Sequence, residues 1–311
     1  MREIKRIAIL GAGAIGSSFA SMFSDAPGFV PLLIAKGDRL EKLNKNGIMV
    51  NKKSYTIPAI HPDKGDTPVD LIIVALKHHH LADAIHGLEK LMDNSTTIIS
   101  VMNGLESEVY LSDIYGSDRV LYAVSVALDA VRKDNQTTYT QKGKLFLGQP
   151  DNTRLSQRVL RVQAAFDRAE IVYETPMDMI RIMWWKFMVN VGMNPSSALM
   201  GASYGIFQTS PDARGLMEAL MVEVITIAEK MDINLTCQDI KDWYTFLANL
   251  SPKGKTSMLQ DVEAGRKTEI EIFSGKVVEL GKTHGIKTPV NQTLLQAIRV
   301  LEQGDRFSHF T

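Results

Sequence analysis

The stretch that decides the fold of this chain is RIAILGAGAIG, residues 6–16. A β-type run ends directly in the pattern G-x-G-x-x-G, and a helical pattern follows it. Glycines in such a strand–turn–helix allow a tight turn and let a pyrophosphate reach the backbone N–H groups that open the helix. A plain strand–helix turn is the alternative, but the flanking strand and helix favour a dinucleotide site. The predicted binding residues are Gly11, Ala12, Gly13, Ala14, Ile15 and Gly16.

Short apolar runs and helical patterns alternate through the first half of the chain, which predicts a parallel sheet covered by helices. Strands are expected at 6–10, 30–34, 69–76, 96–101 and 120–126, and helices at 15–24, 81–92 and 105–114. Hairpin strands are expected at 137–141 and 144–147, then a helix at 154–168 and a strand at 171–173. From residue 179 onward the pattern is helical. We therefore expect an α/β domain over residues 1–174 and an all-α domain over 175–311.

Composition excludes several classes of protein. The 311 residues contain 35 Lys plus Arg and 35 Asp plus Glu, so no net charge favours nucleic acid as a partner. No apolar run reaches the roughly 20 residues that span a bilayer, and Ile7–Leu10 is too short for a signal peptide. The single cysteine, Cys237, suits a reducing compartment. We expect a cytoplasmic protein with no membrane partner; a homodimer remains open.

The end of the second predicted strand bears on the choice between NAD and NADP. An acidic residue there would bind the ribose 2′-hydroxyl, whereas a cation would accept a 2′-phosphate. Lys36 occupies that position and Arg39 follows it, although Asp38 lies between them. The sequence favours NADP and leaves open whether Lys36 or Arg39 holds the 2′-phosphate.

Polar residues follow two further strands, at Lys77 and at Asn103-Gly104. Ligands of open parallel sheets bind at the carboxyl ends of the strands, so both side chains could contact cofactor or substrate. A solvated lysine and an ordinary Asn-Gly turn are the alternatives. The neighbouring run His78–His80 predicts a surface helix start, because successive helical side chains diverge by about 100° and cannot meet at one metal ion.

A polar stripe lies on the apolar helix predicted around residues 183–194. Lys186, Asn190 and Asn194 follow one another at intervals of four, which places them on one helix face. Burying an amine and two amides without partners is costly, so this face must meet polar groups. A hydrogen-bond network between helices and a substrate pocket with a lysine acid are both consistent with the pattern.

Farther along, Thr268 and Glu271 have the spacing of a capping box at the start of a helix. Glu269 would then occupy the first helical position. There it could face a ligand, or it could serve only as a favourable charge at the helix N-terminus.

Taken together, these motifs resemble the ketopantoate reductase (2-dehydropantoate 2-reductase) family. They are Gly11–Gly16, Leu76-Lys77, Asn103-Gly104, Trp185-Lys186 with Asn190 and Asn194-Pro195, and Ser257–Asp261 with Thr268-Glu269-Ile270. The resemblance covers nearly the whole chain. It implies a Rossmann-type domain with a parallel sheet, an all-α second domain, and NADPH-dependent reduction of a 2-oxo acid in the cleft between them.

The resemblance also assigns roles to individual residues. Lys186 would donate a proton to the ketone oxygen, and Glu269 would lie by the nicotinamide ribose and the substrate. The substrate would be bound by Asn103, Lys186, Asn190, Asn194 and Ser257, and the cofactor by the glycine turn, Lys36, Lys77, Asn103 and Glu269.

Ketopantoate is the expected substrate, which would place the enzyme in pantothenate and coenzyme A biosynthesis. A paralogue that reduces another branched 2-oxo acid is the alternative with the same mechanism. A non-catalytic NADP-binding sensor would be expected to have lost Lys186 or Glu269, and both are present. No metal is expected.

Overall fold

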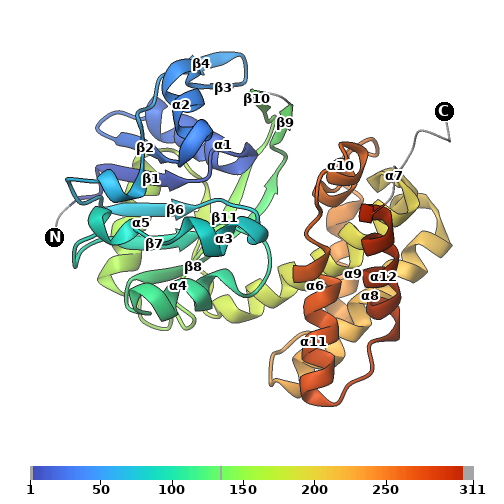
Figure 1. Ribbon diagram of the computed structural model, residues 1–311. Coiled ribbons are helices and arrows are strands. Elements are labelled where there is room, and N and C mark those ends of the chain that lie inside the picture. The colour runs from blue at the N-terminus through green and yellow to red at the C-terminus, as the bar shows by residue number, and fades with distance from the viewer. Residues whose placement is uncertain (1–2, 134, 304–311) are drawn as a thin grey trace. The chain divides into compact units, whose positions relative to one another are not determined.

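The computed structural model describes residues 3–133 and 135–303. The chain divides into two compact units, Met1–Ile182 and Met183–Thr311. As predicted, the first unit is an α/β structure and the second is helical (Figure 1). The division falls within one long helix, α6 (Met179–Met200). No helix within the described ranges is both long and apolar enough to cross a membrane.

An eight-stranded sheet forms the centre of the first unit (Figure 1). The strand order is β12-β11-β8-β7-β6-β1-β2-β5, and every neighbouring pair is parallel except β11 and β8. The strands are β1 (Arg6–Leu10), β2 (Val30–Ile34), β5 (Ala59–Ile60), β6 (Leu71–Val74), β7 (Thr97–Ser100), β8 (Val120–Leu128), β11 (Lys142–Gly148) and β12 (Tyr173–Glu174).

A second, four-stranded sheet has the order β4-β3-β10-β9. Its strands are β3 (Ile48–Val50), β4 (Lys53–Tyr55), β9 (Val131–Lys133) and β10 (Gln136–Thr138). The helices of the first unit are α1 (Ala14–Asp25), α2 (Gly37–Asn46), α3 (Leu81–Ala84), α4 (Ser107–Tyr115) and α5 (Gln157–Arg168), with short 3₁₀ turns η1 (Pro62–Lys64), η2 (His78–His80) and η3 (Leu88–Leu91).

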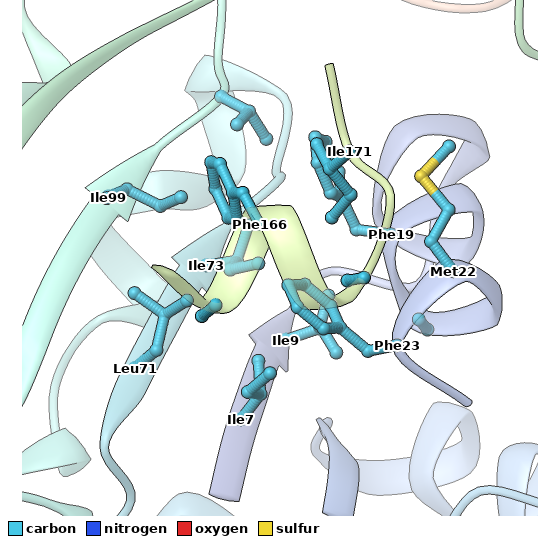
Figure 2. Packing of buried hydrophobic residues seen from close by; sticks show 14 of the residues in the cluster. Ile7, Ile9, Phe19, Met22, Phe23, Leu71, Ile73, Ile99, Phe166 and Ile171 are labelled. Atoms are coloured by element: carbon cyan, nitrogen blue, oxygen red, sulfur yellow. The ribbon is translucent and has the colours of Figure 1, made fainter. Parts of the chain in front are cut away.

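Both faces of the main sheet are buried, which explains why its central strands are continuously apolar. In β1, Ile7 and Ile9 face one core and Ala8 and Leu10 face the other, as the two-residue period of a strand requires. Figure 2 shows the first core, where Phe19 and Phe23 of α1 and Phe166 of α5 pack with Ile9, Ile73 and Ile99 of the strands.

The second unit contains most of α6, whose apolar residues Phe187, Met188 and Val191 are buried. Gly192 allows close contact with α8, because a Cβ built there would lie 2.6 Å from side-chain atoms of Met221. The remaining elements are α7 (Tyr204–Thr209), α8 (Pro211–Lys230), α9 (Cys237–Leu247), α10 (Ser257–Glu263), η4 (Ile270–Ile272), α11 (Ser274–His284) and α12 (Pro289–Gln303).

Three local predictions were wrong. The helix expected over 81–92 is interrupted at Gly87, whose φ of +95° favours glycine and ends the regular helix. The strands expected at 137–141 and 144–147 do not pair with each other. Instead β10 pairs with β9 and β3, while β11 joins the main sheet against β8 and buries Leu145 and Leu147 in its core. The third, the capping box at Thr268, concerns the candidate site.

Candidate active site

The glycine turn between β1 and α1 has two glycines that the fold itself requires. Gly11 has a φ of +104°, and a Cβ there would lie 2.5 Å from the Ala75 carbonyl oxygen. A Cβ on Gly16 would lie 1.8 Å from the carbonyl oxygen of Gly11. At Gly13, in contrast, an added Cβ would have no protein atom within 4 Å among the described residues. Packing therefore does not explain the middle glycine, whereas a ligand that approaches the start of α1 would.

Two arginines donate hydrogen bonds to this turn, whereas a lysine from the same edge of the sheet donates to helix α3. Arg39 Nη2 donates to the Ala12 carbonyl oxygen at 2.7 Å, and Arg132 Nη1 donates to the same oxygen. Lys36 is exposed, and its Nζ donates to the carbonyl oxygen of Asp83 at 3.2 Å. The sequence singled out Lys36 and Arg39 but not Arg132. Arg132 reaches the turn through the strand pairing of the second sheet, and no local sequence motif indicates its position.

Lys77 and Asn103 follow the adjacent parallel strands β6 and β7. Because β1 also runs parallel to β6, the glycine turn and both residues lie at one edge of the sheet. Both side chains are partly buried. Lys77 directly precedes the turn η2, whose histidines begin a helical segment as predicted. No cluster of His, Cys, Asp or Glu in the described ranges has the arrangement of a metal site.

A buried hydrogen-bond chain supports the loop that carries Asn103. The Met102 N–H donates to Ser100 Oγ at 3.3 Å, and the hydroxyls of Ser100 and Ser107 lie 2.8 Å apart. Ser107 Oγ donates to Glu108 Oε2 at 2.8 Å. Burial raises the pKa of Glu108 to about 7, against the opposing effect of these hydrogen bonds. No sequence motif indicates this carboxyl, which lies within the helix α4.

In the second unit, Lys186, Asn190 and Asn194 lie on α6 at the predicted helical spacing. The two asparagines are buried, and Lys186 is partly buried. Burial lowers the pKa of Lys186 to about 8, because desolvation disfavours its charged form. An ammonium with a pKa in this range can release its proton near neutral pH, as a general acid must.

Asn194 also ties α6 to the start of α10. Its Oδ1 accepts hydrogen bonds from Ser257 Oγ at 3.1 Å and from the Met258 N–H at 3.2 Å. Its Nδ2 donates to Asn190 Oδ1 at 3.4 Å. For Asn194, these contacts agree with one of the two interpretations of the polar stripe, a hydrogen-bond network between helices. Ser257 is exposed at the first position of α10.

The loop around Glu269 does not contain the predicted capping box. Thr268 donates from its N–H and its hydroxyl to Glu302 of α12, and Glu271 forms a two-point ion pair with Arg299 at 2.7 Å. The carboxylate of Glu271 is therefore engaged with α12, and α11 begins only at Ser274. Glu269 precedes η4 and is partly buried. Thr268 and Glu271, on either side of it, are both held by α12, which anchors this loop.

A glycine turn that leaves space for a ligand, at the edge of a parallel sheet, is the arrangement of a Rossmann-type dinucleotide-binding domain. Family comparison is more specific. Residues 7–152 match the family model "Ketopantoate reductase PanE/ApbA", and residues 178–302 match that of its C-terminal region. The chain belongs to the ketopantoate reductase family.

Individual relatives cover nearly the full length of the chain. The 2-dehydropantoate 2-reductase of Halobacterium salinarum is 24% identical over 303 residues, which are 96% of this chain and 99% of that protein. The 2-dehydropantoate 2-reductase structure from Geobacter metallireducens is 25% identical with a TM-score of 0.83, covering 95% and 99% of the two chains. A D-mandelate dehydrogenase structure with NADH and anilino(oxo)acetate has the same fold, at 20% identity and a TM-score of 0.85, with 96% and 98% covered.

Proposed function

We propose that this chain is an NADP-dependent 2-dehydropantoate 2-reductase, which reduces the C2 ketone of 2-dehydropantoate to give pantoate. Family membership supports the reaction class. The observation that carries the catalytic proposal is the position of Lys186, partly buried on the face of α6 that it shares with the buried Asn190 and Asn194, where burial lowers its pKa to about 8. In this proposal residues 1–174 hold the cofactor and 175–311 hold the substrate, in the cytoplasm, for pantothenate biosynthesis.

Lys186 would act on the ketone oxygen. Hydride addition at C2 breaks the carbonyl π bond and places negative charge on that oxygen. The ammonium of Lys186 would stabilise this charge and then transfer one proton to it, which completes the alcohol and leaves a neutral amine that water reprotonates. When bound, the reduced nicotinamide would supply the hydride. Asn190, Asn194 and Ser257 would hold the substrate's polar groups, and Glu269 would lie by the nicotinamide ribose and the substrate.

The rest of the cofactor would be held by the first unit. The N–H groups at the start of α1, over the space left by Gly13, suit a pyrophosphate. Lys77 and Asn103 are proposed to contact the cofactor from the same sheet edge, and Lys36 and Arg39 favour NADP over NAD. The fold does not decide this choice, since the similar D-mandelate dehydrogenase structure contains NADH.

The test is the loss of NADPH absorbance at saturating 2-dehydropantoate, beside a panel of other branched 2-oxo acids and with NADH in parallel. We expect 2-dehydropantoate to have the highest kcat/KM and NADPH to exceed NADH. A higher kcat/KM for another member of the panel would identify a paralogous reductase. Binding of NADPH without turnover of any 2-oxo acid would identify a sensor. Size-exclusion chromatography would decide whether the protein is a homodimer.

A further inference from the structure

Two guanidinium groups from distant parts of the first unit meet at the glycine turn. Arg39 comes from α2 and Arg132 from β9, and both donate to the carbonyl oxygen of Ala12. Arg132 Nη1 also lies 3.5 Å from Ser17 Oγ, in the first turns of α1. Both cations therefore lie beside the turn where a dinucleotide would bind, at the edge of the sheet.

The second sheet explains how Arg132 reaches this position. β9 pairs with β10, which pairs with β3, so the strand is part of one sheet rather than a loose loop. Within β9, Val131 and Lys133 are exposed while Arg132 is partly buried. This alternation is the two-residue period of a strand, so Arg132 and Lys133 point to opposite faces. Lys133 therefore provides a neighbouring cation on the face away from the glycine turn.

Like charges held this close together oppose each other. Burial lowers the pKa of Arg132, and the nearby charge of Arg39 lowers it further. The oxygen that both groups share is a carbonyl, which carries no net charge. An anion between the two groups would reverse the repulsion, and guanidinium groups match phosphate oxygens in geometry. Lys36 instead donates to the Asp83 carbonyl.

We propose that Arg132, together with Arg39, binds the 2′-phosphate of the cofactor, so that Arg132 is a specificity-determining residue. This inference rests on the NADP dependence in the proposed function. Lys36 becomes a secondary contact, and the selectivity for NADP comes from a strand about 100 positions away from the second strand of the nucleotide fold.

Two fragments separate the 2′-phosphate from the rest of the nucleotide. Adenosine 2′,5′-bisphosphate and adenosine 5′-monophosphate differ only by that phosphate, and neither needs catalysis. Their dissociation constants would be measured by calorimetry for the wild type, Arg132→Met, Arg39→Met and the control Lys133→Met. We expect Arg132→Met to bind the bisphosphate at least about 10-fold more weakly, as the loss of one charged hydrogen bond implies. Its affinity for the monophosphate should change less than about 2-fold, and Lys133→Met should resemble the wild type.

Other outcomes would overturn the assignment. Equal losses for both fragments would place Arg132 on the 5′-phosphate or on the turn itself, and unchanged affinity for both would remove it from the site. If Arg132→Met does not fold, Arg132→Lys keeps the charge without the planar fork. We then expect a loss of at least about 3-fold for the bisphosphate alone. A wild type without preference for the bisphosphate would contradict NADP dependence itself, whereas a preference that survives Arg132→Met would contradict only this inference.

Discussion

The charge of Lys186 lowers the stability of the folded protein, as a buried functional group often does. Its ammonium is desolvated by burial, which lowers its pKa to about 8. A lysine kept only for structure would contribute stability, whereas this one destabilises the folded state whenever it is charged. Removal of its charge should therefore raise the stability of the folded protein and lower the rate of catalysis.

Lys186→Met should stabilise the protein and slow turnover. At pH 7 we expect the free energy of unfolding to rise by about 1–2 kcal/mol, because the buried charge is gone and the aliphatic stem remains. Hydride transfer should fall by about 10²–10⁴-fold, the usual contribution of a general acid. Urea unfolding and single-turnover kinetics on the same preparation measure both quantities. Lys241→Met, on the exposed face of α9, is the control and should change neither.

The pH dependence follows from the same pKa. Between about pH 8 and the unfolded value of 10.5 the unfolded chain binds more protons than the folded one, so stability should rise with pH in this window. Turnover in the reduction direction should fall above about pH 8, because the ammonium that donates the proton is lost. A kcat that stays level up to pH 10 would contradict Lys186 as the donor, provided that hydride transfer limits the rate.

Glu108 predicts a pH effect of the opposite sign. Its folded-state pKa of about 7 exceeds its ordinary value of 4.5, so the folded protein binds more protons in this window and stability should fall from pH 4.5 to pH 7. Glu108→Gln keeps the shape without the charge. At pH 8 it should stabilise the protein by about 1–3 kcal/mol, and the difference from the wild type should vanish near pH 4. Denaturant unfolding at several pH values would show this; a pH-independent difference would place the effect elsewhere.

At the scale of elements, periodicity predicted the strands and helices that pack against a large core. The central strands were found because both of their faces are buried, and α6 because its polar side chains recur every four residues. The second sheet was only partly predicted. Its strands have three residues each, too few for a period to show, and β3 and β10 are joined across 85 residues.

Tertiary contacts also overrode local motifs. Thr268 and Glu271 have the spacing of a capping box, but Glu302 and Arg299 of α12 offer stronger charged partners. The motif is local and its competitors lie about 30 residues away, so the sequence alone could not decide between them. The same holds for Arg132, whose position depends on the pairing of strands that short motifs do not reveal.

The junction between α6 and α10 should depend on Asn194. Replacement by alanine leaves the Met258 N–H and the Ser257 hydroxyl without this acceptor, so we expect a loss of about 1–3 kcal/mol in the free energy of unfolding. Ser257→Ala, which removes only one partner at an exposed site, should cost less than about 1 kcal/mol. An Asn194→Ala variant with wild-type stability and a raised KM would instead limit Asn194 to substrate binding.

At the scale of the whole molecule, the residues proposed to bind the cofactor phosphates and the proposed acid belong to different units of the chain. The sequence predicted an α/β region followed by a helical region. Short β-type runs with glycine turns occur in the first, and helical patterns occur throughout the second. The sequence could not decide between ketopantoate and another branched 2-oxo acid, because the side chains that distinguish these substrates form no local motif.

The order of binding follows from this division. NADPH should bind without substrate, since the proposed phosphate contacts lie in the first unit. At 100 times its dissociation constant it should stabilise the protein by about 2.7 kcal/mol. The 2-oxo acid alone should have little effect on the melting temperature. Product-inhibition patterns in which the 2-oxo acid binds obligatorily first would contradict this order.

The central claim is that Lys186 donates the proton in an NADPH-dependent reduction of 2-dehydropantoate. Single-turnover oxidation of bound NADPH, followed by stopped-flow absorbance in wild type and Lys186→Met, tests it most directly. We predict rapid oxidation in the wild type and a rate lower by about 10²–10⁴-fold in a variant that is folded and binds NADPH normally. A folded variant that oxidises NADPH at the wild-type rate would contradict the account.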